Sequence, residues 1–136
     1  MPDYVAMMPF AQAIGVQVSS AGAGEVIGTL DWTPERTTAG GALHGGALMA
    51  FADSIGAVCA FLNLPSGAST STTSSNTVFL RGVRAGTVTA TARPMHVGRS
   101  TIAVLTELRD ADGRLVAQVT QTQAVLGGSA GAGSQP

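Results

Sequence analysis

Between residues 37 and 80 the chain carries a single formal charge, the carboxylate of Asp53, and its neighbours are apolar. Burying an unpaired charge among apolar side chains is costly, so a carboxylate at this position is expected to be paired or used. His44, Gly45 and Gly46 stand shortly before it, and such a glycine turn can open a helix with bare backbone N–H groups. An anion-binding helix start followed by a lone acid predicts a catalytic site.

Both features belong to one long predicted helix, residues 45–63. Residues 64–67, Leu-Pro-Ser-Gly, are expected to end it, because proline and glycine stop helices and form turns. The helix is apolar on nearly all sides, so it must be covered on most of them. A strongly curved antiparallel sheet wrapped around this single helix meets that requirement, and the predicted fold class is α+β.

Alternation of apolar and polar residues predicts about five strands, mostly antiparallel, around the helix. Residues 9–18 are predicted to form a short helical turn that leads into a strand. The other predicted strands are residues 24–32, 69–80, 86–97, 100–109 and 115–126. In the last of them the alternating set is Val116, Gln118, Thr120, Thr122 and Ala124. Residues 110–113, Asp-Ala-Asp-Gly, indicate a hairpin turn before that strand.

Length and charge limit the class of protein. The 136 residues suffice for one core that covers roughly two thirds of the unfolded surface. Only 11% of them are charged, against a usual fraction of about 25%, so part of the surface is expected to be buried in an oligomer. The net charge of −1 leaves no electrostatic footprint for nucleic acid. We expect one domain over residues 1–126 and a disordered Gly/Ala/Ser tail over residues 127–136.

The sequence also bears on redox chemistry and location. Cys59 is the only cysteine, which excludes an intramolecular disulfide and a cysteine metal cluster, and its apolar surroundings predict an inert core thiol. The N-terminus has no basic segment before its apolar residues, which argues against a secretory signal. The apolar run at residues 47–62 is too short for a membrane span and contains Asp53. We therefore expect a cytoplasmic protein that binds neither membrane nor nucleic acid.

Several short motifs follow one another along residues 9–126. They are Leu43-His44-Gly45-Gly46-Ala47, Ala52-Asp53-Ser54, Phe79-Leu80-Arg81, Gly86, His96-x-Gly98-Arg99 and Asp112-Gly113-Arg114-Leu115-Val116-Ala117. In this order they resemble the hotdog-fold acyl-CoA thioesterases, specifically the PaaI-like branch of phenylacetic acid degradation. Each motif alone is weakly specific. A histidine and two glycines, with an acid eight residues past the first glycine, are more specific when the other motifs are in register.

The resemblance implies a hotdog fold, a curved antiparallel sheet of five to six strands wrapped around one long central helix. It implies homodimers that pair edge to edge, further joined as homotetramers. It also implies hydrolysis of acyl-CoA thioesters, with an aryl-acetyl, aroyl or medium-chain acyl group. The resemblance further implies a reaction without a metal, and without a separate cofactor because CoA is part of the substrate.

Site residues carry over by position. In the family, the N–H of a helix-start glycine contacts the thioester carbonyl, which maps to Gly45, and a helix acid acts as general base or nucleophile, which maps to Asp53. A polar helper six residues before the histidine maps to Thr38, where the family commonly has Asn or Gln. A strand hydroxyl near the acid maps to Thr72. His44 is expected near the site, with positioning of the turn favoured over proton chemistry.

Thioester hydrolysis needs stabilisation of a developing oxyanion and an activated water or carboxylate nucleophile. Backbone N–H groups at a helix start supply the first, and Asp53 supplies the second. Eight residues of helix rise about 12 Å, so one substrate carbonyl cannot touch both Gly45 and Asp53 of the same helix. The spacing therefore predicts a composite site, in which the two residues come from different subunits of a dimer.

CoA carries a 3′-phosphate and a pyrophosphate, and the planar guanidinium of arginine binds phosphate well through paired hydrogen bonds. All seven basic residues are arginines, and four of them lie between residues 81 and 99. With the resemblance, the expected substrate- and CoA-binding residues are Gly46, Arg81, Arg84, Gly98, Arg99 and Ser100.

Two other functions stay open. Hotdog hydratases use an Asp four or five residues before a His, and residues 39–43 contain no acid, which makes this interpretation the weaker one. A non-catalytic acyl-CoA-binding module is opposed by the presence of Asp53. It is kept open by Thr38, which stands where the family commonly has an amide.

Overall fold

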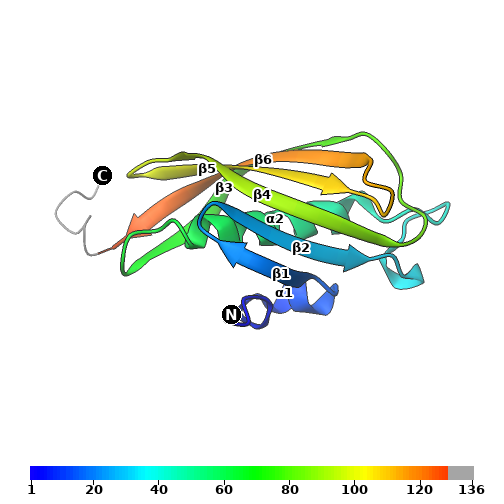
Figure 1. Ribbon diagram of the computed structural model, residues 1–136, viewed down its shortest axis with the longest axis horizontal. Coiled ribbons are helices and arrows are strands. Elements are labelled where there is room, and N and C mark those ends of the chain that lie inside the picture. Colours follow the sequence, from blue (N-terminus) through cyan, green and yellow to red (C-terminus); the bar gives the residue numbers. More distant parts are fainter. Residues whose placement is uncertain (129–136) are drawn as a thin grey trace.

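The computed structural model describes residues 1–128. Six antiparallel strands form one curved sheet in the order β1-β2-β4-β5-β6-β3, and the long helix α2 packs against it (Figure 1). The strands are β1 (Gln17–Gly22), β2 (Glu25–Asp31), β3 (Ala68–Phe79), β4 (Thr87–Val97), β5 (Thr101–Arg109) and β6 (Leu115–Gly127). The helices are η1 (Val5–Met7), α1 (Pro9–Ala13), η2 (Pro34–Arg36) and α2 (Gly45–Phe61). This architecture confirms the predicted α+β class and the sheet wrapped around one helix.

Helix α2 starts where the glycine turn predicts and stops two residues earlier than expected. Its sheet-facing side carries Phe51, Ile55 and Cys59, all fully buried. They form one core with strand residues that include Leu30, Val88, Ile102, Val104 and Leu108. Each fully buried side chain of this size contributes about 1.5–3 kcal/mol through the hydrophobic effect. Burial raises the pKa of the Cys59 thiol to about 11, as expected for a core cysteine.

One stripe of α2 faces away from the core. Ala50, Asp53, Ala57 and Phe61 are each only partly buried or exposed, while the neighbouring positions Phe51, Ala52, Ile55 and Val58 are buried. Their spacing of three or four residues places them on one face of the helix. The N-terminal segment with α1 lies beside this stripe, since Met8 lines hollows together with Asp53, Ala57 and Phe61. The four residues are called the outer stripe below.

Strand β6 differs from the sequence-based expectation in which face it buries. The buried residues past the strand start are Ala117, Val119, Gln121 and Gln123. The alternating set expected from the sequence continued instead through Gln118, Thr120, Thr122 and Ala124. The cause is a β-bulge. Leu108 pairs with Ala117 and Arg109 with Leu115, so Val116 is passed over in the ladder. One extra residue shifts the inward face by one position, and both Val116 and Ala117 become buried.

Strand β3 lies at one edge of the sheet and pairs only with β6 within the chain, leaving its other edge unpaired over twelve residues. Long free edges are normally blunted or paired with another chain.

The predicted tail, residues 127–136, begins one residue too early, because Gly127 still pairs with Ala68 at the end of β6. Residues 129–136 lie outside the described part. No helix within residues 1–128 is long and apolar enough to cross a membrane.

Candidate active site

Asp53 sits in the middle of the outer stripe, and two side chains donate hydrogen bonds to it. Thr72 Oγ1 on β3 donates to Asp53 Oδ1 at 2.7 Å, and Gln121 Nε2 on β6 donates to the same oxygen at 3.0 Å. Within residues 1–128 the second oxygen, Oδ2, has no hydrogen-bond donor. The carboxylate is therefore held by one oxygen and keeps the other available.

The two donors belong to a longer chain of polar groups. Thr70 Oγ1 shares its one proton between Gln123 Oε1 at 3.0 Å and the Ala124 carbonyl at 2.8 Å, and Gln123 Nε2 donates to Thr72 Oγ1 at 2.6 Å. Thr72 then donates to Asp53, so the donors from Gln123 onward point toward the carboxylate. Gln123 is fully buried and Gln121 is 2% exposed. Because a buried unpaired amide group costs about 1–3 kcal/mol, the bonds that these glutamines make favour this arrangement and hold Asp53 in one orientation.

Gly56 on α2 makes room for Gln121. A Cβ at position 56 would overlap the Gln121 Oε1 and would lie only 2.6 Å from the Gln121 Cδ. Gln121 Oε1 has no hydrogen-bond partner in the described structure, so the only firm polar contact of this amide is its bond to Asp53. The small residue in the middle of an otherwise well-formed helix is thus explained by the amide packed against it.

We expect Gly56→Ala to lower both stability and turnover. A glycine-to-alanine change inside a helix normally stabilises by about 0.8–1.0 kcal/mol. Here the added methyl displaces the Gln121 amide, and overpacking of this kind costs about 1–3 kcal/mol. Thermal unfolding and steady-state kinetics measure the two effects. In a double-mutant cycle, the same change made together with Gln121→Ala should be neutral or stabilising. An equal loss of stability in both backgrounds contradicts the contact.

The start of α2 presents one free backbone donor. His44 caps the helix, and its Nδ1 accepts from the Gly46 N–H at 2.8 Å. The Gly45 N–H has no acceptor among residues 1–128. The Phe79 ring from the end of β3 lies beside Gly45, with its Cζ 3.3 Å from where a Cβ would stand. Gly45 therefore offers an unpaired N–H next to an aromatic ring that is 48% exposed.

Thr38 lies in the loop before the helix. Its backbone N–H donates to Ala42 and its carbonyl accepts from Gly41, which makes residues 38–42 a tight turn. Thr38 is exposed, and no hydrogen bond within the described part joins it to Asp53. Within one chain the structure thus brings Thr72 to Asp53, whereas Thr38, His44 and Gly45 gather at the helix start.

The arginines proposed for CoA do not form one cluster in a single chain. Arg81 and Arg84 lie in the loop between β3 and β4, and this loop is tied to the residues before α2 by a 2.8 Å bond from Leu43 N to Val83 O. Gly98, Arg99 and Ser100 form the turn at the opposite end of β4. The eleven residues of β4 separate the two groups by roughly 30–35 Å.

The arginines also differ in whether they are already paired with a carboxylate. Arg93 forms an ion pair with Glu25, with its Nε at 3.0 Å and its Nη2 at 2.6 Å from one carboxylate oxygen. Arg81, Arg84 and Arg99 are exposed and form no ion pair among residues 1–128. In the same part of the chain no three His, Cys, Asp or Glu side chains are grouped as metal ligands.

A hollow opens beside Asp53. It has a volume of about 270 Å³ and is lined by Met8, Pro9, Phe10, Ala11, Ala50, Asp53, Ser54 and Ala57. Apart from Asp53 and Ser54 these side chains are apolar, and the Ser54 hydroxyl is occupied by the Ala50 carbonyl at 2.7 Å. Asp53 is therefore the ionisable group among the residues that line this largely apolar hollow, which α2 and the N-terminal segment form.

Sequence reasoning missed Gln121 and Gln123, the two buried amides behind Asp53. A signal was present, because they alternate with Val119 and Val125 along one strand. Two glutamines in the same alternating series as apolar residues indicate buried polar groups that need partners. Identifying Asp53 as one of those partners requires the pairing between β3 and β6.

Comparison with known proteins identifies the family. The family model described as the thioesterase superfamily matches residues 40–117, which include His44, Gly45 and Asp53. A protein of Mycobacterium tuberculosis H37Rv named "Putative esterase Rv1847" is 33% identical over 114 residues, 82% of this chain and 81% of that protein.

Solved structures give the same result. Thioesterase HI1161 from Haemophilus influenzae is 27% identical with a TM-score of 0.86, over 91% of this chain and 87% of that chain. A Ralstonia eutropha JMP134 protein described as a "putative thioesterase, phenylacetic acid degradation-related protein" is 30% identical with a TM-score of 0.81, over 91% and 100%. The chain is a thioester hydrolase that belongs to the thioesterase superfamily, in its hotdog-fold, PaaI-like branch.

Proposed function

We propose that the protein hydrolyses acyl-CoA thioesters to the free acid and CoA, with an aryl-acetyl, aroyl or medium-chain acyl group. The observation that carries the proposal is Asp53, which has one oxygen held by Thr72 and Gln121 and the other without a donor among the described residues 1–128. The same residue lines an apolar hollow, which suits an acyl group. A free carboxylate oxygen suits attack on a carbonyl carbon or activation of water against it.

Gly45 of the neighbouring subunit supplies the second element. Eight residues of helix separate it from Asp53 of its own chain by about 12 Å, which is too far for one carbonyl. The free edge of β3 and the exposed apolar residues Met49, Val78, Phe79 and Leu80 support a homodimer at this side of the molecule. With the two α2 helices antiparallel across the dimer axis, the helix start of one subunit faces the acid of the other.

In the proposed reaction the thioester carbonyl oxygen accepts a hydrogen bond from the Gly45 N–H. Asp53 either takes a proton from a water that attacks the carbonyl carbon, or attacks that carbon itself. In the second route water then hydrolyses the resulting anhydride. In both, the C–S bond breaks, the CoA sulfur gains a proton, and water supplies an oxygen to the acid. Thr38 orients water and His44 positions the helix start.

The CoA moiety is held by arginines of both subunits. Arg81 and Arg84 lie beside the α2 start of their own chain, whereas Arg99 and Ser100 lie at the far end of β4. An antiparallel pair of subunits moves the far end of one chain toward the helix start of the other. Gly98 belongs to this turn, and Gly46 leaves room at the helix start. The unpaired state of Arg81, Arg84 and Arg99 among the described residues supports phosphate binding.

The same proposal includes pairing of dimers as a homotetramer in the cytoplasm. The charged fraction of 11% supports it, since a small domain with so little charge hides part of its surface in an assembly. Light scattering on the purified protein distinguishes a dimer from a tetramer, and a monomer that is fully active contradicts the composite site.

The activity is tested on a panel of phenylacetyl-, hydroxybenzoyl-, hexanoyl- and palmitoyl-CoA, with thiol release as the readout and Asp53→Ala beside the wild type. We expect turnover of the aryl and hexanoyl thioesters and its loss in the variant. Absence of turnover on every thioester, from a folded dimeric sample, overturns the acyl-CoA assignment.

A further inference from the structure

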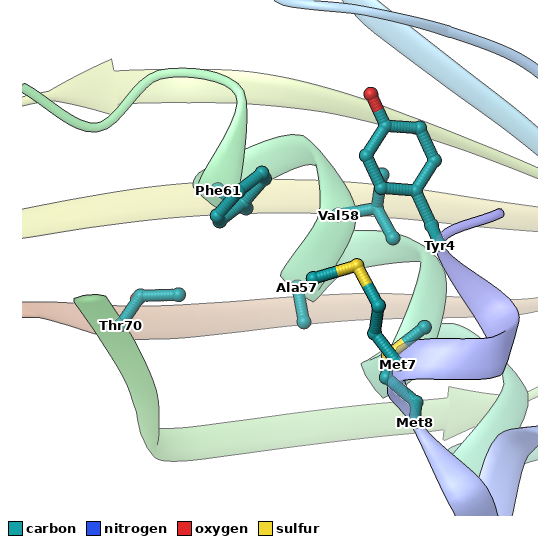
Figure 2. Close-up of a pocket in the computed structure, with 7 residues that line it drawn as sticks. All are labelled: Tyr4, Met7, Met8, Ala57, Val58, Phe61 and Thr70. Carbon is teal, nitrogen blue, oxygen red and sulfur yellow. The ribbon is translucent and has the colours of Figure 1, made fainter. Parts of the chain in front are cut away.

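A second hollow lies on the outer stripe, one helical turn beyond Asp53. It has a volume of about 180 Å³ and is lined by Tyr4, Met7, Met8, Ala57, Val58, Phe61 and Thr70 (Figure 2). These seven residues are called the Met7–Phe61 pocket. The N-terminal segment supplies Tyr4 and the methionines, the end of α2 supplies Phe61, and β3 supplies Thr70.

The interior of the pocket is apolar. The Thr70 hydroxyl is occupied by Gln123 Oε1 at 3.0 Å and the Ala124 carbonyl at 2.8 Å, which leaves its methyl group for the pocket. The Tyr4 hydroxyl points away from Met7 and Thr70 (Figure 2). Met7 is 66% exposed and Phe61 is 45% exposed, so both are unusually open to solvent for large apolar side chains. An apolar occupant would cover them.

The pocket adjoins the Asp53 hollow, and Met8 and Ala57 line both. Ala57 follows Asp53 by four residues, a rise of about 6 Å along the helix. A substrate whose reacting carbonyl lies at Asp53 therefore reaches the pocket with the far end of a compact acyl group.

Two features set the size of an occupant. The far end is bounded by Phe61 and Tyr4, whose rings meet edge to face with centroids 6.4 Å apart and planes at 68°. The volume of about 180 Å³ is close to that of apolar cavities of about 150 Å³ that hold benzene. Methionine thioethers also contact aromatic rings favourably.

We infer that the Met7–Phe61 pocket binds the acyl group of the substrate, and that Ala57 and Phe61 determine its size. The occupant is a compact apolar acyl group, an aromatic ring or a chain of about six carbons. This inference rests on the proposed acyl-CoA hydrolysis and adds to it the place and the limit of the acyl group. Ala57 is the small residue at the entrance, and Phe61 is the end wall.

The test compares acetyl-, hexanoyl-, phenylacetyl- and decanoyl-CoA on two variants. Ala57→Leu fills the entrance, and we expect kcat/KM for phenylacetyl- and hexanoyl-CoA to fall about ten- to a hundredfold while that for acetyl-CoA changes less than about threefold. Phe61→Ala removes the end wall, and we expect decanoyl-CoA to gain about tenfold relative to hexanoyl-CoA. Ala13→Leu, on the exposed end of α1, is the matched control and should keep the wild-type profile.

The outcomes separate the pocket from the reaction. No turnover of any thioester by the wild type overturns the proposed function. Wild-type turnover with an unchanged acyl profile in both variants overturns the assignment of the pocket. Equal losses on all four thioesters in Ala57→Leu and Phe61→Ala also overturn it, because they indicate a general defect at Asp53. If Ala57→Leu does not fold, the profile of Phe61→Ala decides the question by itself.

Discussion

Asp53→Asn is expected to lower kcat for thioester hydrolysis by about 10²–10⁴, the usual contribution of a positioned acid or base. The fold should be unaffected, because both donors to Asp53 bond the same oxygen. The Oδ1 of an asparagine can accept from Thr72 and Gln121 as before. Its amide nitrogen then takes the place of Oδ2, which meets no donor within the described residues. The loss is therefore chemical and not structural.

Kinetics, thermal unfolding and CoA-thioester binding on the same sample separate these effects. Asp31→Asn is the matched control, since Asp31 also accepts a threonine hydroxyl, from Thr87 at 2.7 Å, but lies at the end of β2. We expect the control to retain wild-type turnover. An Asp53→Asn variant that turns over substrate at the wild-type rate removes Asp53 from the mechanism.

Gly45→Pro is expected to lower kcat by about 10²–10³, because it removes the only N–H proposed to bind the oxyanion. Proline is tolerated here. Position 45 is the first residue of α2, where a missing N–H breaks no helix hydrogen bond. His44 has φ −60° and ψ 132°, the extended conformation preferred before proline. The helix should thus form normally while the donor is lost.

Gly45→Ala is the control for the added carbon atoms. It keeps the N–H and places a Cβ 3.3 Å from the exposed Phe79 ring, which can move. We expect Gly45→Ala to retain most of the activity that Gly45→Pro loses, with similar unfolding temperatures for both. Equal activities of the two variants contradict a role for the Gly45 N–H.

Mixing the two inactive variants tests the composite site. In a dimer of one Gly45→Pro chain and one Asp53→Asn chain, one of the two composite sites is intact. Random exchange should therefore restore about a quarter of wild-type activity, since half of the dimers are mixed. If Gly45 and Asp53 of the same chain worked together, every mixed dimer would be inactive. Refolding the variants together and assaying thiol release distinguishes the two arrangements.

Much of the fold follows from local patterns. Helix α2 was predictable because an apolar run begins after His44-Gly45-Gly46 and ends before Pro65, and the strand positions follow from alternation. The face of β6 did not follow. The bulge at Val116 depends on pairing with β5. The alternation of residues along β6 alone does not show where the buried face changes from even- to odd-numbered positions.

The site divides in the same way. Asp53 stands out in the sequence because a charge in an apolar helix is costly, and Gly45 because a helix start leaves N–H groups free. Thr72 and the two glutamines reach Asp53 only through the register of β3 against β6. Arg81 and Arg99 lie close in the sequence, yet the length of β4 places them at opposite ends of the sheet.

The sequence by itself therefore determined the helix, its free start and its one acid, because these depend on composition and short-range spacing. Only the tertiary structure decided which groups hold that acid. Gln121 lies 68 residues from Asp53 in the chain and becomes its neighbour through strand pairing and the shifted face of β6. The Met7–Phe61 pocket likewise requires the N-terminal segment to lie beside the outer stripe of α2. Contacts between distant segments depend on register and packing, which no local pattern encodes.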